Sequence, residues 1–532
     1  MVIRADGMRY GWGVQDVLSL PDAYNAAVDF IDHAPAPDDK TAFIDRAGTH
    51  TYGDLKRRVD SVGSALLGMG LGRDDRLAMA MLDAFDFPGV FWGAIKAGIV
   101  PICMNTLLTT ESYDYVLRDC RARALVVSEE LLERFAPILD DLPDLEHVIV
   151  AGADDGRHTT LDELLATTSG ELAAADTAGD DVAFWLYSSG STGLPKGVRH
   201  RHGSPAQTAH TYGRTVLGLE EHDVVYSAAK LFFAYGLGNA MTFPLRVGAT
   251  AVLLDGRPTP DAVMEIMAIH QPTAFFGVPT LYAALLADEA NTPETGSSRL
   301  RVCVSAGEAL SEVVGNAWEE RFGVPILDGI GSTEMLHIFV SNRPGDIRYG
   351  SSGTPVPGYE ARIVDESGGE VAAGALGELL ISGPSTAAGY WNQDEKDAAT
   401  FEGPWTHTGD KYVQDANGYY HYGGRSDDMF KVGGNWVSPF EVESTIAEHE
   451  AVLEAAVIGS PDEAGNLKPK AYVILLPGGS GDDGLMAVLQ EWVKSRLEPW
   501  KYPRSIEFVD EFPRTATGKI QRFKLRELDH TS

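Results

Sequence analysis

The chain has 532 residues, of which 44% are hydrophobic and 23% charged, a composition typical of a globular protein with several domains or subdomains. Its 43 basic and 77 acidic residues give a net charge of −34. This charge argues against nonspecific binding to nucleic acid or to an anionic membrane, because both require a positive surface. It is compatible with a local basic site for a phosphorylated ligand.

The three cysteines, Cys103, Cys120 and Cys303, are odd in number and far apart, so a reducing cytoplasm is expected rather than a disulfide framework. No CxxC pair is present, which argues against a zinc site. The N-terminus lacks the apolar core of a signal peptide. The most apolar window, 87–104, is interrupted by Lys96, glycines and prolines, so it does not indicate a membrane span.

The first part of the chain, up to about Gly353, alternates apolar runs with helical patterns, which predicts βαβ units and a largely parallel sheet. The predicted helices are 55–67, 85–97 and 112–121. The predicted strands are 76–82, 98–104, 124–127, 147–150, 182–186, 224–227, 249–254, 302–305 and 325–327. Open sheets of this kind bind ligands at the carboxyl ends of their strands.

After Gly353, short alternating segments joined by glycine-rich turns, such as the one at 416–418, predict antiparallel β structure. From Asp428 the pattern becomes a compact α+β unit of domain size. Its predicted elements are helices 439–449 and 484–497 and strands 455–459, 471–476 and 506–509.

The strongest local signal is the loop 187–197, YSSGSTGLPKG, which follows a predicted strand. Its backbone N–H groups and hydroxyls can donate to a phosphate, and Lys196 adds a positive charge. The Walker A template, GxxxxGK[ST], does not fit when counted from Gly190, because Pro195 and Gly197 stand at two of its fixed positions. A phosphate-binding loop of another kind is therefore expected.

This loop closely resembles the phosphate-binding signature of the adenylate-forming superfamily, which includes acyl- and aryl-CoA synthetases, peptide-synthetase adenylation domains and firefly luciferase. Other segments resemble further motifs of that superfamily, and six motifs in the same order are very specific. These segments are the adenine-flanking Gly307-Glu308-Ala309, the adenine, α-phosphate and magnesium motif 328–334 (DGIGSTE), the ribose motif 405–410 (WTHTGD), the hinge 424–428 (GRSDD) and the catalytic-lysine loop 513–519 (PRTATGK).

The resemblance implies an α/β protein with two domains. A large N-terminal domain, residues 1–426, would contain βαβ subdomains and a distorted antiparallel β subdomain and would bind ATP and the acid. A small, mobile α+β C-terminal domain, residues 427–532, would carry the catalytic lysine and turn about a hinge at Asp427.

Site residues follow from the matched motifs. Lys519 would bridge the acid's carboxylate and the α-phosphate, with Thr333 and Glu334 as further catalytic residues. Glu334 would also hold Mg²⁺, which accepts one or two carboxylates together with phosphate oxygens. Asp410 can accept both ribose hydroxyls, and Arg425 offers fixed donors nearby. The other implied ATP and coenzyme A contacts are Ser188, Ser189, Gly190, Ser191, Thr192, Gly193, Lys196, Gly307, Glu308, Ala309, Asp328, Gly329, Ile330, Gly331, Ser332, Lys431, Gly433 and Gly434.

The acid pocket resembles that of the benzoate-CoA ligase branch. Many superfamily members carry a histidine where this chain has Phe233. A flat aromatic acid suits a slot between Tyr235 and glycine-lined backbone. His337 could hold a ring substituent or the carboxylate, or could be a buried core histidine. The predicted pocket residues are Phe233, Ala234, Tyr235, Gly236, Ala306, Gly331, His337 and Ile338.

The leading hypothesis is a cytoplasmic, Mg·ATP-dependent ligase that joins benzoate or a substituted benzoate to coenzyme A through an aryl adenylate. Two alternatives use the same machinery: a medium-chain or alicyclic acyl-CoA synthetase, and a stand-alone adenylating enzyme that loads a carrier protein. The small molecules expected are an aromatic carboxylic acid, ATP and coenzyme A. Neither nucleic acid nor membrane is an expected partner, and a homodimer is expected only by resemblance to the family.

Overall fold

The computed structural model describes residues 17–153, 156–168, 170–188, 195–462, 465–476, 478–514 and 520–531. The described chain divides into two compact units. The larger unit contains the chain up to Ala361 together with Ile381–His407, and the smaller contains Arg362–Leu380 and the chain from Thr408 onward.

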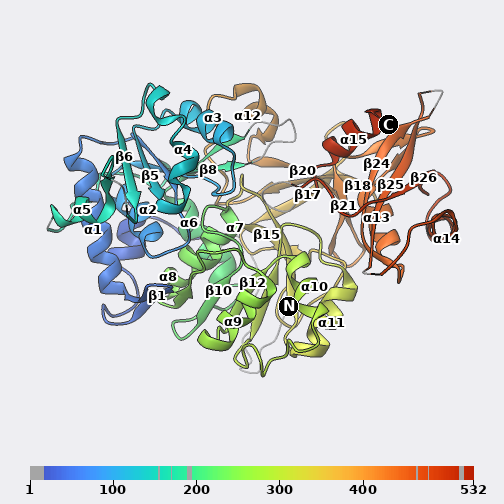
Figure 1. Ribbon diagram of the computed structural model, residues 1–532, viewed down its shortest axis with the longest axis horizontal. Coiled ribbons are helices and arrows are strands. Elements are labelled where there is room, and N and C mark those ends of the chain that lie inside the picture. Colours follow the sequence, from blue (N-terminus) through green and yellow to red (C-terminus); the bar gives the residue numbers. More distant parts are fainter. Residues whose placement is uncertain are drawn as a thin grey trace. The chain divides into compact units, whose positions relative to one another are not determined.

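The first sheet of the larger unit has seven strands within the described residues, in the order β7-β6-β5-β3-β4-β8-β9. All neighbouring pairs are parallel except β8 and β9, which are antiparallel. Helices α3 and α4 pack on one face of this sheet (Figure 1). The strands are β3 (Arg76–Ala80), β4 (Val100–Cys103), β5 (Ala124–Ser128), β6 (His147–Ala151), β7 (Thr159–Thr160), β8 (Val182–Ser188) and β9 (Lys196–Arg201), and the helices are α3 (Thr110–Cys120) and α4 (Leu132–Phe135).

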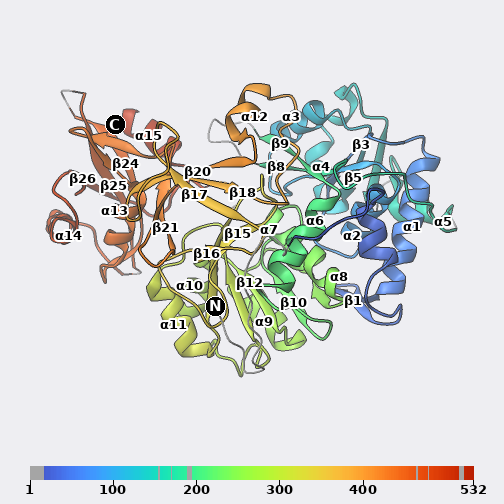
Figure 2. The same cartoon turned by 180° about the vertical axis from the view of Figure 1, so that it is seen from behind.

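A second sheet of the same unit has nine strands among the residues described, in the order β16-β15-β14-β13-β12-β10-β11-β1-β2. Its centre is parallel, and antiparallel strands lie at both edges. Helices α9, α10 and α11 cover one face with apolar side chains (Figures 1 and 2). The strands are β1 (Thr41–Asp45), β2 (Gly48–Thr51), β10 (Val224–Ser227), β11 (Thr250–Val252), β12 (Ala274–Gly277), β13 (Val302–Ser305), β14 (Ile326–Gly331), β15 (Ile338–Ser341) and β16 (Thr354–Pro355), and the helices are α9 (Pro260–His270), α10 (Pro279–Ala287) and α11 (Glu312–Phe322).

Antiparallel β structure follows, as the sequence predicts. Strands β17, β18, β20 and β19 form one sheet in that order, with β21 paired to β20. In the smaller unit, β24 lies antiparallel and β26 parallel to β25. Helices α13 and α14 cover one face of this sheet, and α15 the other. The bounds are β17 (Glu360–Val364), β18 (Leu376–Ser382), β19 (Phe401–Glu402), β20 (Trp405–Gln414), β21 (Tyr420–Arg425), β24 (Val452–Pro461), β25 (Leu467–Leu475), β26 (Ser505–Phe508), α13 (Pro439–Ala447), α14 (Asp483–Lys494) and α15 (Arg522–Thr531).

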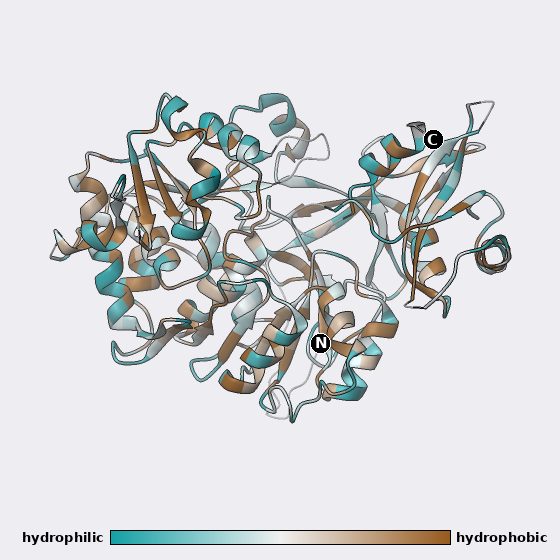
Figure 3. Cartoon of the chain, viewed as in Figure 1, coloured by the Kyte–Doolittle hydropathy of each residue, from teal (hydrophilic) through white to brown (hydrophobic). Residues whose placement is uncertain are grey.

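The predicted βαβ pattern is confirmed, with informative differences. The strand expected at 325–327 extends to Gly331, so the whole DGIG segment, 328–331, belongs to β14. Strand β12, with the short sequence AFFG, was not predicted. Figure 3 shows hydrophobic residues concentrated on the strands and hydrophilic residues on outer helix surfaces. No helix in the described part of the chain is both long and apolar enough to cross a membrane.

Helices α1 (Tyr52–Gly68) and α2 (Asp86–Lys96) are joined by a buried ionic cluster. The Nζ of Lys96, at the end of α2, donates to Asp32 over 2.7 Å and to Asp60 of α1 over 2.6 Å. Burial disfavours the ammonium, but the two carboxylates outweigh that effect and raise the pKa of Lys96. A side chain that looks isolated in an apolar stretch thus fixes the packing of two helices.

Replacing Lys96 by methionine should therefore destabilise the larger unit by about 3–5 kcal/mol, because it leaves buried carboxylates without their cation. The measurement is the urea midpoint of the first unfolding transition, followed by tryptophan fluorescence. Arg57→Met is the matched control, since the side chain of Arg57 is 72% exposed in its pair with Asp54. It should change stability by no more than about 0.5 kcal/mol. Equal shifts for both variants would contradict this account.

Candidate active site

The predicted phosphate loop joins two paired strands. Ser188 ends β8 and lies opposite Lys196, which begins β9. The Ser188 hydroxyl is buried and lacks a hydrogen-bond partner among the described residues. The structure therefore fixes both ends of the loop. The predicted contacts Ser189, Gly190, Ser191, Thr192 and Gly193 lie outside the described residues.

Lys196 and Glu334 meet through a tyrosine. The Lys196 Nζ donates to the Tyr390 hydroxyl over 3.0 Å, and this hydroxyl donates to Glu334 Oε1 over 2.8 Å. Lys196 Nζ also lies 4.3 Å from the centre of the Tyr390 ring, a cation–π distance. The Lys196 and Glu334 charges are themselves 3.9 Å apart, with side chains 17% and 16% exposed. Two of the predicted ATP-site groups are thus brought together.

The segment that contains Tyr390 runs along β9. Tyr390 pairs with Val198, and the Trp391 N–H donates to the Gly197 carbonyl over 2.9 Å. At its other end the Ala387 N–H donates to the Glu334 carbonyl over 2.8 Å. This segment therefore ties the end of the phosphate loop to the turn that carries Glu334. It was missed from the sequence because an isolated Gly-Tyr-Trp has no charge or metal-ligand pattern.

The neighbouring strands β13 and β14 place the predicted adenine-motif residues side by side, since Ser305 at the end of β13 is in register with Asp328 of β14. Gly307 follows β13 in the left-handed region at φ 95°. Asp328 is 4% exposed, and burial raises the pKa of its carboxyl well above the usual range. Neither Asp328 Oδ1 nor the Ser305 hydroxyl has a hydrogen-bond partner within the described chain. The expected contacts Glu308 and Ala309 follow Gly307.

A hairpin turn carries the magnesium motif. Gly331 ends β14 opposite Ile338, the first residue of β15. A Cβ at Gly331 would lie 2.6 Å from the His337 carbonyl oxygen, so only glycine allows this close approach. Gly329 and Ile330 precede it on β14, and Ser332 and Thr333 stand in the turn before Glu334.

The predicted acid pocket begins at helix α7 (Ala234–Leu237), which Phe233 precedes. The Tyr235 hydroxyl reaches the carbonyls of Gly277 and Val304, at the ends of β12 and β13, over 3.3 and 3.2 Å. A Cβ at Gly236 would lie 2.1 Å from the Lys230 carbonyl oxygen, which explains the glycine. Ala306, another predicted pocket residue, is buried directly after β13.

His337 lies in the same group of aromatic side chains, 5.6 Å from the Tyr235 ring and 4.5 Å from the Phe243 ring. Its Nε2 faces two oxygens, Asn239 Oδ1 at 3.1 Å and the Tyr235 carbonyl at 3.3 Å, so this nitrogen carries the proton. Nδ1 is buried and has no partner among described residues. Burial lowers the pKa of His337 to about 3, and the imidazole is neutral at physiological pH.

The remaining predicted contacts lie in the smaller unit. Asp410 and Arg425 face each other on β20 and β21, and Arg425 Nη1 donates to Asp410 Oδ1 over 3.0 Å. Burial disfavours the guanidinium charge, but the Asp410 carboxylate outweighs it and raises the pKa of Arg425. Lys431 stands on a hairpin of β22 (Phe430–Val432) and β23 (Asn435–Val437), whose turn is Gly433-Gly434. Lys519 lies outside the described residues.

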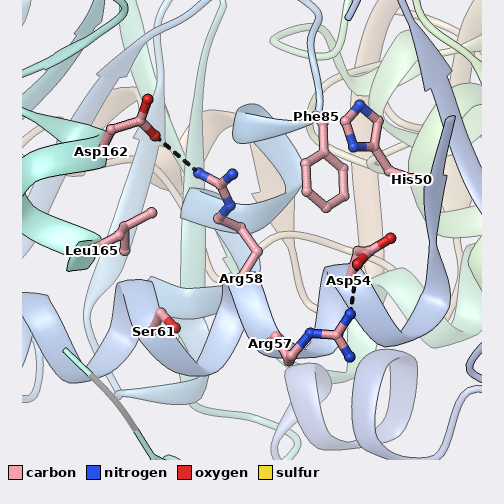
Figure 4. Close-up of a pocket in the computed structure, with 8 residues that line it drawn as sticks. All are labelled: His50, Asp54, Arg57, Arg58, Ser61, Phe85, Asp162 and Leu165. Carbon is pink, nitrogen blue, oxygen red and sulfur yellow. Dashed lines mark hydrogen bonds and ion pairs between the residues drawn. The ribbon is translucent and has the colours of Figure 1, made fainter. Parts of the chain in front are cut away.

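A surface hollow of 360 Å³ lies elsewhere in the larger unit, against α1 and α5 (Leu161–Ala166) (Figure 4). Its arginines are already neutralised: Arg57 lies 2.6 Å from Asp54, and Arg58 lies 2.8 Å from Asp86 and 3.8 Å from Asp162. This hollow contains none of the predicted site residues, and its paired charges indicate no particular ligand.

Family models match both parts of the chain: the AMP-binding enzyme model matches residues 30–391, and that of the AMP-binding enzyme C-terminal domain matches residues 441–519. The chain is 57% identical to a benzoate–CoA ligase of Thauera aromatica, over 96% of this chain and 97% of that protein. It is 51% identical to a 4-hydroxybenzoate–CoA/benzoate–CoA ligase of Rhodopseudomonas palustris, over 95% and 94%.

Solved structures agree with these matches. An anthranilate CoA ligase in complex with anthranoyl-AMP superimposes with a TM-score of 0.91 and 43% identity, covering 97% of this chain and 99% of that one. A benzoate CoA ligase from Burkholderia xenovorans LB400 gives a TM-score of 0.89 and 47% identity, over 94% and 100%.

The His337 environment predicts a pH effect on stability. The pKa of His337 is about 3 in the folded chain, against an ordinary value of 6.5. Between these two pH values the imidazole is protonated in the unfolded chain and neutral in the folded chain. Stability should therefore fall as the pH falls from 6.5 toward 3. His337→Gln should flatten this dependence in urea midpoints measured between about pH 7 and about pH 4.5. His222→Gln, which removes a histidine 69% exposed, is the control. An unchanged slope in His337→Gln would contradict the buried neutral imidazole.

Proposed function

We propose that this chain, which belongs to the family of AMP-binding enzymes, uses ATP to ligate benzoate or a substituted benzoate to coenzyme A. It is an AMP-forming acid–thiol ligase. The observation that carries this conclusion is the 57% identity to a benzoate–CoA ligase over nearly the whole length of both proteins. The slot that the sequence predicts between Tyr235 and glycine-lined backbone would suit the same class of acid.

The reaction has two steps. A carboxylate oxygen of the acid attacks the α-phosphorus of ATP, and pyrophosphate leaves. The thiol of coenzyme A then loses its proton and attacks the acyl carbonyl, and AMP leaves with both electrons of the broken bond. The first step brings two anions together, so the site must supply positive charge and hydrogen-bond donors where charge develops.

Within the larger unit, we assign phosphate binding to the loop from Ser188 to Lys196. The carboxylate of Glu334 is suited to Mg²⁺, which would enter with ATP and neutralise phosphate charge. Magnesium accepts one or two carboxylates together with phosphate oxygens, so a single glutamate is a sufficient protein ligand. Thr333, in the same turn, would donate its hydroxyl to the α-phosphate.

Adenine would lie against the backbone at the ends of β13 and β14. The assigned contacts are Gly307, Glu308, Ala309, Asp328, Gly329, Ile330, Gly331 and Ser332. Two residues with unpartnered buried oxygens, Ser305 at the end of β13 and Asp328 beside it on β14, support a polar ligand there.

The smaller unit would contribute groups for both steps. Asp410 would accept the ribose hydroxyls, with Arg425 holding its carboxylate in place. Lys519 would bridge the acid's carboxylate and the α-phosphate in the first step. The Lys431 hairpin, with Gly433 and Gly434 both in the left-handed region, would pass close to the pantetheine arm in the second.

We further propose that residues 1–426 and 427–532 act as separate domains that move about Asp427. The next residue is bound to the C-terminal part of the smaller unit: Asp428 lies 3.3 Å from Arg522 and 3.4 Å from Arg526, both on α15. These ion pairs would carry Asp428 along with α15, so the turning point would lie immediately before it.

For the acid, we assign the ring to the space beside Phe233, Ala234, Tyr235 and Ile338. The neutral His337 is fixed by Asn239 and would shape this space rather than neutralise the carboxylate. A cytoplasmic location is proposed because all three cysteines are free and buried, as suits a reducing compartment. A homodimer is proposed from family resemblance alone.

The test is AMP release with a panel of acids, each offered with free coenzyme A and with a phosphopantetheinylated carrier protein. Benzoate or a hydroxy- or aminobenzoate should support coenzyme A-dependent turnover at least about tenfold faster than octanoate or cyclohexanecarboxylate. Lys519→Ala serves as the control that lacks adenylation. Turnover with octanoate alone would overturn the aryl assignment, and turnover only with the carrier protein would overturn the ligase assignment.

A further inference from the structure

We infer that Tyr390 is a positioning residue that keeps Lys196 and Glu334 apart, so that the lysine can serve phosphate while the carboxylate serves the metal. The inference rests on the proposed function and adds a residue to its ATP site. It comes from the contacts of three segments that are distant in sequence: β9, the turn after β14, and the segment 385–391.

Lys196 and Glu334 carry opposite charges in a site that is only slightly exposed, where their attraction is stronger than in water. Left alone, the two side chains would form a direct ion pair, and each would then be occupied when Mg·ATP arrives. In the structure the Tyr390 hydroxyl accepts from Lys196 over 3.0 Å and donates to Glu334 over 2.8 Å. The charges remain 3.9 Å apart, a distance at the limit of an ion pair.

The tyrosine is suited to this place because its surroundings hold it in position. It is 4% exposed, and its ring packs 5.4 Å from that of Phe401. Its N–H donates to the Asp397 carboxylate, and its backbone pairs with Val198 of β9.

The ring and the hydroxyl have separable roles. The ring lies 4.3 Å from the lysine Nζ and would remain in Tyr390→Phe, so the fold and the cation–π contact would be kept. The hydroxyl bonds to both charged groups. Without it, Lys196 can move onto Glu334, and both groups are withdrawn from Mg·ATP.

Tyr390→Phe should therefore raise the KM for Mg·ATP about tenfold, as expected for loss of one hydrogen bond to a charged group. The KM for benzoate should stay within about twofold, as should the rate of benzoyl-CoA formation from premade benzoyl adenylate, a step that needs no Mg·ATP. The Mg²⁺ concentration needed for half-maximal pyrophosphate exchange should rise in parallel.

Tyr52→Phe is the matched control, because it removes another buried hydroxyl, which bonds to the Ala249 carbonyl over 2.7 Å rather than to Lys196 or Glu334. It should leave all of these constants unchanged. As a second measurement, the affinity for ATP is compared between Tyr390→Phe and the parent protein. The difference between the two proteins should be smaller in the presence of EDTA than in the presence of Mg²⁺. This comparison can be made even if turnover is lost.

An unchanged KM for Mg·ATP, or equal losses in the Mg·ATP-dependent step and in the step from premade adenylate, would overturn the inference. Failure of the proposed function would look different, because the parent protein itself would then show no acid-dependent pyrophosphate exchange.

Discussion

Opposite charges must stand close together in this site without neutralising one another. The Tyr390 hydroxyl bonds to Lys196 on one side and to Glu334 on the other. The backbone around it pairs with β9 and donates to the Glu334 carbonyl, so the same short segment contacts both of the predicted motifs. The positions of Lys196 and of the turn that carries Glu334 therefore depend on one short segment.

The chain has a net charge of −34, which bears on how it can bind its proposed substrates. All of the proposed substrates are anions, and the field of the whole chain opposes their approach. Within the described residues, Lys196 and Arg425 each have a carboxylate close by, at 3.9 Å and 3.0 Å. Both cations are thus held in place by a carboxylate in the structure without a ligand. In the proposed function, recognition of the anionic substrates would be local, through such pairs of charges rather than through a positive surface.

Much of the fold could be predicted from the sequence because buried parallel strands appear as short apolar runs between helical patterns. The motif residues could be assigned by family resemblance, and Gly331 and Ile338 do face each other on one hairpin. The contacts that could not be predicted join residues that are far apart in the sequence. Lys96 meets Asp32 and Asp60 only after three helical segments pack, and Tyr390 lies 194 residues from the lysine that it contacts. Neither Lys96 nor Tyr390 belongs to a recognisable sequence motif. Their partners come within reach only through tertiary packing.

Transfer of oxygen from the acid to the nucleotide tests the central claim most directly. With benzoate labelled with ¹⁸O in its carboxylate, unlabelled ATP and coenzyme A, the AMP released is examined by mass spectrometry. The account predicts one ¹⁸O atom in each AMP, because the carboxylate oxygen that attacks the α-phosphorus stays with the phosphate when the thiol displaces it. AMP without label, or label in the released pyrophosphate, would contradict an acyl adenylate on the path to the thioester.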